Sequence, residues 1–194
     1  MLFANSKYIM RTMAASKSNP QISLRPQDVV VLLRLALEKD KPTTYAALAQ
    51  DTQLTASEVH ACIKRCVTAQ LVHKNEDGKP QVLLEPLKLF LTHGVRYCFP
   101  AVRGEMTRGL PTSYAAPPLA DKIVAGNEPI PVWPDKNGTA RGMTLQPLYP
   151  TVPCAAVRNP QLYELLVLTD ALRSGNPRER AIAQQLLETR LTET

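Results

Sequence analysis

Apolar residues recur at intervals of three and four through the first third of the chain, and this pattern predicts helices. Between residues 24 and 38 the apolar positions follow helical spacing, and Pro26 suits a first-turn position. A shorter apolar set covers 45–52, with Thr43 or Thr44 available as its N-cap. The pattern therefore predicts two helices separated by a short break.

A third helix is predicted to start at Ala56, because Thr55 and Glu58 have the spacing of a capping box. One stripe of this helix is apolar and is expected to pack inward: Val59, Cys62, Ile63, Cys66 and Val67. The other positions are polar, small or basic, and are expected to face solvent: Ser57, His60, Ala61, Lys64, Arg65 and Thr68.

A β-hairpin is predicted directly after the third helix. Leu71–His73 and Val82–Leu84 read as its strands, and Asn75–Gly78 reads as the turn, with Asp-Gly supplying positive φ. Three helices followed by a hairpin predict a winged helix-turn-helix unit between about Leu24 and Leu84.

Four stretches of this unit resemble the MarR-type winged-helix regulators: Thr44–Ala49, Leu54–Val59, Ile63–Val67 and Leu71–Val72. The resemblance covers about 60 residues. It implies a DNA-binding fold and a role in transcription regulation, with the third helix entering the major groove and the hairpin lying beside it.

Lys64 and Arg65 are expected to lie on a solvated face whose only acid is the capping Glu58, which favours DNA over a protein partner. An adaptor helix would tolerate more acids and more exposed apolar groups at these positions. Lys74 and Lys79 flank the hairpin turn and are expected near phosphates. The candidate DNA contacts are Thr44, Thr55, Ser57, His60, Ala61, Lys64, Arg65, Thr68, Lys74 and Lys79.

Composition agrees with a polyanionic partner, since the net charge is +6 and the pI is about 9.3. Residues 1–23 read as a flexible basic arm, and no stretch is apolar for long enough to span a membrane. The four cysteines are expected to be reduced thiols in a soluble cytoplasmic protein. Cys62 and Cys66 are one helical turn apart, but packing as small apolar residues is favoured over metal binding.

The second half of the chain differs from the first in its proline and glycine content. After a short helix predicted over Pro86–His93 and closed by Gly94, 11 of the 17 prolines and 5 of the 8 glycines fall between residues 100 and 160. Because this segment also holds many apolar residues, we expect an ordered, loop-rich layer without helices. Arg103–Tyr114 is read as a structural loop, with anion or partner binding as the alternative, and Trp133 as a core anchor rather than a pocket wall.

A helical hairpin is predicted at the end of the chain, because Asn159-Pro160 and Asn176-Pro177 each offer an N-cap followed by proline, with Gly175 between the helices. Its expected apolar positions are Leu162, Leu165, Leu166, Thr169 and Leu172 in the first helix, and Ala181, Ile182, Gln185, Leu186 and Leu191 in the second. The hairpin could complete this chain's own core or pair with a second copy.

The predicted fold class is α+β: a flexible arm (1–23), a winged helix-turn-helix domain (24–94), and a proline-rich segment with a C-terminal helical hairpin (95–194). The expected function is sequence-specific binding of double-stranded DNA as a dimeric repressor, with the dimer held by the arm or by the hairpin. The alternative is a winged-helix antitoxin or defence-system regulator that autoregulates its operon and binds a partner protein through 95–194. A third possibility is an adaptor that contacts only proteins. No nucleophile, metal or phosphate-loop pattern can be assembled, so no enzymatic activity, catalytic residue, metal or cofactor is expected.

Overall fold

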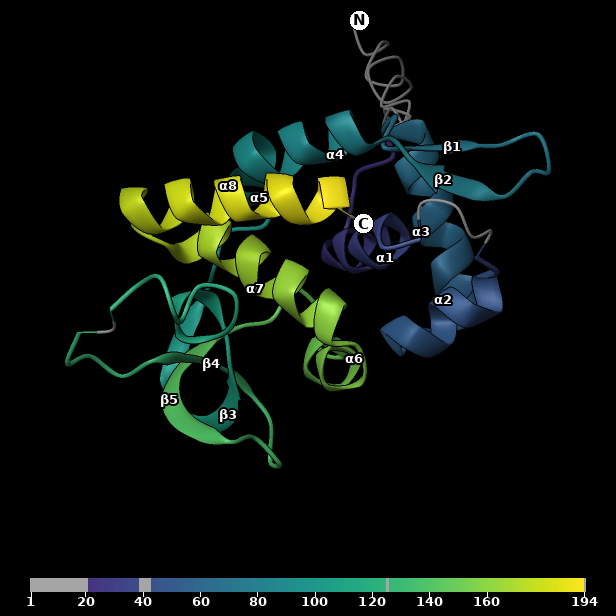
Figure 1. Cartoon of the computed structure of the whole chain (residues 1–194). Coiled ribbons are helices and arrows are strands. Elements are labelled where there is room, and N and C mark those ends of the chain that lie inside the picture. Colours follow the sequence, from purple (N-terminus) through teal and green to yellow (C-terminus); the bar gives the residue numbers. More distant parts are fainter. Residues whose placement is uncertain (1–20, 39–42, 125, 194) are drawn as a thin grey trace, which may run out of the picture.

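In the part of the chain that the structure describes, helices come first and last, with two small sheets between them (Figure 1). The computed structural model describes residues 21–38, 43–124 and 126–193. The fold is therefore α+β, as predicted. Most of the predicted arm, residues 1–20, lies outside the described residues. None of the described helices has the length and apolar character needed to cross a bilayer.

The elements follow one another in a mixed order along the chain. The helices are α1 (Pro26–Ala36), α2 (Tyr45–Thr52), α3 (Ala56–Thr68), α4 (Leu84–Leu89), α5 (Val95–Cys98), α6 (Val152–Arg158), α7 (Pro160–Ser174) and α8 (Pro177–Glu193). The strands are β1 (Val72–Lys74), β2 (Pro80–Val82), β3 (Arg103–Pro111), β4 (Pro131–Pro134) and β5 (Ala140–Leu145). A π-helical turn (Phe90–Gly94) joins α4 to α5, and a 3₁₀ turn (Ser113–Ala115) follows β3.

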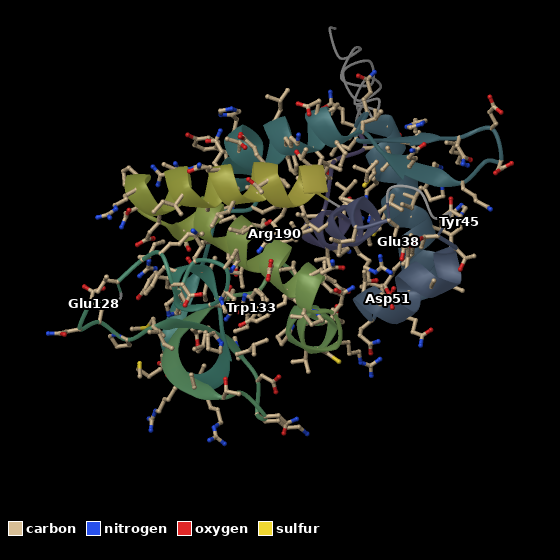
Figure 2. All side chains as sticks on the ribbon, in the orientation of Figure 1. Glu38, Tyr45, Asp51, Glu128, Trp133 and Arg190 are labelled. Atoms are coloured by element: carbon tan, nitrogen blue, oxygen red, sulfur yellow. The ribbon has the colours of Figure 1, made fainter. Side chains whose placement is uncertain are left out.

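Helix α1 runs through the interior, and every residue from Asp28 to Ala36 is buried. It packs against α2, α3 and α7, so apolar side chains are needed around most of its circumference. Near its end, the Arg34 guanidinium pairs with Glu38 at 2.5 Å and with Asp51 of α2 at 2.7 Å. Glu38 and Asp51 lie close together at the junction of these helices (Figure 2). The pairings fix α2 against α1.

The connection from α2 to α3 forms as the sequence predicts. The Thr44 hydroxyl accepts from the Ala47 N–H at 3.1 Å and caps α2. Gln53 ends α2 with φ at 56°. The Thr55 hydroxyl accepts from the Glu58 N–H at 3.2 Å, and the Glu58 carboxylate accepts from the Thr55 N–H at 2.9 Å. The predicted capping box is therefore confirmed.

One position of the predicted stripe on α3 is wrong. Val59, Cys62, Ile63 and Cys66 are buried, whereas Val67 is 37% exposed. Val67 lies in the last turn of α3, one turn beyond the buried Ile63 and at the edge of the buried stripe.

The predicted hairpin forms with shifted strand boundaries. Strands β1 and β2 are antiparallel, with Val72 opposite Val82 and Lys74 opposite Pro80. Gly78 has φ at 73°, which confirms the positive φ expected in the turn. The return strand ends two residues earlier than predicted, because helix α4 begins at Leu84.

Gly94 does not close a helix, contrary to the prediction. The helix continues through a wider π turn, in which the Val95 N–H bonds to the Phe90 carbonyl, and ends only at Cys98. A Cβ on Gly94 would lie 2.9 Å from the Phe90 ring. Glycine is therefore used at this position for close approach to that ring rather than for termination.

Strands β3, β4 and β5 close into a small barrel, where a loop-rich layer was predicted. The segment 103–114, read as a loop, is strand β3 followed by a 3₁₀ turn, and the region also contains helix α6. The glycines misled the prediction because they serve close packing. A Cβ on Gly109 would lie 2.0 Å from the Trp133 carbonyl oxygen, and one on Gly142 would lie 2.1 Å from that of Ile130.

Trp133 anchors the barrel to α7, as predicted for a core residue (Figure 2). Its indole N–H donates to the Asp170 carboxylate at 2.6 Å, and the Thr112 hydroxyl donates to the same oxygen at 3.0 Å. The Arg173 guanidinium meets the other oxygen at 2.6 Å. Burial raises the pKa of Asp170, and these partners oppose that shift.

The C-terminal helices begin where they were predicted. Asn159 accepts from the Leu162 N–H at 3.0 Å, and Asn176 accepts from the Glu179 N–H at 3.0 Å. The apolar positions of α7 are buried as expected, but in α8 Ala181 and Gln185 are exposed. The side chains of α8 that are fully buried are Ala183, Leu187 and Leu191. Figure 1 shows α8 alongside α7, so the hairpin completes this chain's own core.

Candidate nucleic-acid interface

The exposed side of α3 carries one row of small, polar and basic side chains. Ser57, His60, Lys64 and Thr68 follow helical spacing and are exposed, and Ala61 beside them is half-buried. Glu58, the acid in the first turn, is held by the capping box at the edge of this row. The structure thus brings five of the ten predicted contacts together on one face.

The two predicted cap residues lie next to this row. Thr44 and Thr55 are exposed at the N-termini of α2 and α3. Tyr45, which was not among the predicted contacts, packs its ring against His60 with centroids 5.4 Å apart. Figure 2 shows Tyr45 at the outer edge of this part of the molecule. The contact extends the exposed row of α3 onto α2.

Arg65 does not lie on the solvated face, so this part of the prediction is wrong. Its guanidinium forms two bonds to the Asp28 carboxylate of α1, at 2.7 Å and 2.6 Å. Asp28 is fully buried, and the Arg65 side chain is only 13% exposed. The pairing raises the pKa of Arg65. Arg65 therefore holds α3 on α1, and Lys64 is the only strong cation in the exposed row.

The β1–β2 hairpin places Lys74 in an exposed position and Lys79 in a half-buried one. The Asn75 side chain accepts from the Lys79 N–H at 2.9 Å, which shapes the turn. Glu76 and Asp77 are exposed at the tip between the two lysines. The two acids of the tip balance the charge of the two lysines, so any attraction of the hairpin for phosphate comes from the lysines on the flanks of the tip.

The segment between β5 and α6 reaches the start of α3. The Tyr149 hydroxyl donates to Glu58 at 3.1 Å, and the Thr151 hydroxyl donates to the Thr52 carbonyl at 2.9 Å. Together with residues of α2 and α3 they line a shallow hollow of about 390 Å³. Sequence reasoning missed both residues, because 91 positions separate Tyr149 from Glu58 and no local pattern marks the contact.

Metal binding and cysteine chemistry are the other candidate site functions to consider among the described residues. Across the described ranges, no group of three or more histidine, cysteine or acidic side chains is placed to hold a metal ion. Burial raises the pKa of Cys62 to about 12, with the nearby Asp28 adding to the shift, and burial also raises the pKa of Cys66. Both are protonated apolar packing groups at neutral pH. This agrees with their predicted role as buried side chains.

Comparisons of the chain with protein-family models, with curated proteins and with solved structures gave no match. The function is therefore inferred from the geometry of the chain.

Proposed function

We propose that this protein binds double-stranded DNA sequence-specifically as a transcription regulator, with α3 as its recognition helix. The observation that carries the proposal is the exposed row of α3. It joins hydroxyl, imidazole and ammonium groups that donate to base edges and phosphates, and it contains no acid.

The order of elements supports this reading. A capped helix follows a short helix and a tight turn, and an antiparallel hairpin comes next, an order that is typical of winged helix-turn-helix units. The Arg65–Asp28 pair adds to it, since α3 is held rigidly while its outer face stays free. A rigid recognition helix loses little conformational entropy on entering the groove.

The regulator acts as a dimeric repressor in this proposal. One recognition helix covers a half-site, and a two-fold pair of copies doubles the contacts on a palindromic operator. Occupying a promoter with such a pair blocks transcription without catalysis, cofactor or metal.

A footprint of the purified protein over its own upstream region tests the proposal. We expect one protected palindromic site, with an affinity that falls on the order of ten-fold when Lys64→Ala removes a groove contact. Lys122→Ala, a change of an exposed lysine in the segment between β3 and β4, is the matched control and should leave affinity unchanged. An unchanged affinity in Lys64→Ala would instead favour the adaptor hypothesis.

Salt titration tests the hairpin separately. Lys74→Ala and Lys79→Ala should weaken binding to specific and random DNA alike, and each should reduce the salt slope by about 0.9 for every phosphate that the lysine neutralises. A weakening confined to the specific site would show that the hairpin reads bases instead.

A further inference from the structure

An exposed row with apolar members runs along the continuous helix from α4 through the π turn to α5. Glu85, Leu89, His93 and Tyr97 follow one another at intervals of four, and all are exposed. Leu89 is 62% exposed and Tyr97 is 75% exposed, so the row presents two large side chains to solvent. Within the described ranges, no other segment of the chain covers them.

The π turn helps to keep this row on one side of the helix. Residues four apart on a regular α-helix drift steadily around its axis, and the wider π turn at Phe90–Gly94 corrects that drift. On the inner side, Leu87, Leu91 and Val95 are fully buried at the same spacing. The buried row and the exposed row opposite it therefore both stay aligned along the helix.

Hollows lie beside the exposed row, between this helix and α8. One has a volume of about 600 Å³ and the other of about 510 Å³, and both are lined by Thr92, His93 and Gln184. Leu89 borders the first and Tyr97 the second. Together they form a groove into which a side chain from another helix can insert.

The charges along the helix are asymmetric. Glu85 lies at its start and keeps its side chain 79% exposed, although it contacts Lys88 at 2.8 Å. Arg96 lies near its end, 5.1 Å from the centre of the Tyr97 ring. Two copies packed antiparallel would place each Glu85 against the other copy's Arg96 and Tyr97, whereas parallel copies would oppose like charges. The pattern is thus complementary to itself when the two copies are antiparallel.

We propose that the Glu85–Tyr97 face, together with the groove beside α8, is the surface through which two copies of this chain form an antiparallel, two-fold dimer. Leu89 of each copy inserts into the groove of the other, beside His93. The choice of a second copy as the occupant rests on the proposed function, which requires two recognition helices. In Figure 1, α4 and α5 lie beside α8, whereas α3 lies beyond α1 and next to α2, so we expect this dimer to leave the exposed row of α3 free.

The α8 side of the groove is a necessary part of this surface. Stable dimers bury on the order of 1,200–2,000 Å² in total, and one pair of short helices covers less than that. Gln184, Glu188 and Thr189 of α8 line the groove and supply the remaining contact.

Sedimentation velocity of the full-length protein over a range of concentrations tests the surface. We expect a dimer for the unmodified chain and for Val157→Glu, the matched control, since Val157 is 66% exposed on α6 outside this face. Leu89→Glu and Tyr97→Glu should each weaken the dimer by about ten-fold or more. A monomeric unmodified chain, or a dimer that survives both changes, would overturn the proposal.

Charge reversal tests the antiparallel arrangement. Glu85→Arg and Arg96→Glu should each weaken the dimer, and the double variant should restore it. If the double variant is weaker than either single one, the arrangement is wrong. Thermal melts of every variant identify changes that act through folding, and Leu89→Ala replaces Leu89→Glu if the latter unfolds.

The surface and the proposed function can fail independently. A chain that dimerises, loses its dimer on Leu89→Glu and never binds DNA would support the surface and contradict the function. A monomer that gives a specific footprint would do the reverse.

Discussion

Among the described residues, each half of the molecule contains one fully buried aspartate on a helix. In the first half, Asp28 of α1 receives two bonds from Arg65 and a third from the Arg25 N–H at 2.8 Å. In the second half, Asp170 of α7 also receives three donors, from Thr112, Trp133 and Arg173. A buried carboxylate without such partners would be destabilising by several kcal/mol.

The two sites differ in what they connect. Arg65 belongs to the helix that carries the candidate interface, and its side chain reaches the solvent edge. Arg173 is only 4% exposed, and its network joins α7 to the barrel inside the molecule. The first pair therefore links stability to the position of the proposed recognition helix, whereas the second links α7 to the barrel.

The largest effect is expected at Asp170. Asp170→Ala leaves the buried Arg173 guanidinium without its counter-charge and the Trp133 N–H without an acceptor. We expect the free energy of unfolding to fall by about 3–5 kcal/mol, measured by urea denaturation.

Glu164→Ala is the matched control on the same helix. Glu164 pairs with Arg190 at 2.7 Å, but both side chains are partly exposed, so the expected decrease is about 0–1 kcal/mol. Equal decreases in the free energy of unfolding of Asp170→Ala and Glu164→Ala would show that burial does not make one ion pair more important than the other, which would contradict the comparison.

The next effect is expected at Arg65. Arg65→Ala leaves Asp28 buried with a single backbone donor, and we expect a decrease of about 3 kcal/mol in the free energy of unfolding. Lys64→Ala, one residue earlier, should change it by no more than about 0.5 kcal/mol, because Lys64 is exposed. Urea denaturation of both variants measures the contrast.

A DNA titration of folded Arg65→Ala sharpens that contrast. A weaker affinity with an unchanged salt slope would show that Arg65 acts by positioning α3, since no bond to a phosphate is removed. A reduced slope would show instead that Arg65 leaves Asp28 and reaches a phosphate.

These contrasts explain how far the sequence could predict the structure. The caps at Thr44, Thr55 and Asn159 and the helices after them depend on residues three or four apart, so their pattern is visible locally. Lys64 and Arg65 are adjacent and both carry a positive charge, and only a partner 37 positions away from Arg65 separates their roles. No local pattern in the sequence indicates the pairing of Arg65 with Asp28.

The barrel was not predicted from the sequence, for a related reason. Its strands are short and interrupted by glycine and proline, which usually indicates loops. Gly109 and Gly142 are instead required where strands approach within the reach of a Cβ. Closure of the barrel is a non-local event, and the local pattern does not contain it.

A third carboxylate, Glu58, is the site at which we expect the smallest effect on stability. It accepts three bonds, as Asp170 does: from the Thr55 N–H at 2.9 Å, the Thr55 hydroxyl at 2.8 Å and the Tyr149 hydroxyl at 3.1 Å. Unlike the Asp170 carboxylate, the Glu58 carboxylate is accessible to solvent. The bonds from Thr55, with that from Tyr149, hold the pKa of Glu58 below its ordinary value of 4.5.

The smallest effect is therefore expected from Tyr149→Phe, which removes one donor from Glu58 while water replaces it. Because the pKa of Glu58 is lower in the folded state than in the unfolded chain, its contribution to stability is present above pH 4.5 and is lost as the pH falls through the folded value. With Tyr149→Phe the pKa should rise toward 4.5, so less stability is lost on acidification. Carboxyl NMR titration measures the pKa, and urea denaturation at neutral pH should show a smaller decrease in stability than either aspartate site gives. A decrease as large as that of Arg65→Ala would mean that Tyr149 holds the two halves together, and that the link between stability and α3 extends beyond Asp28.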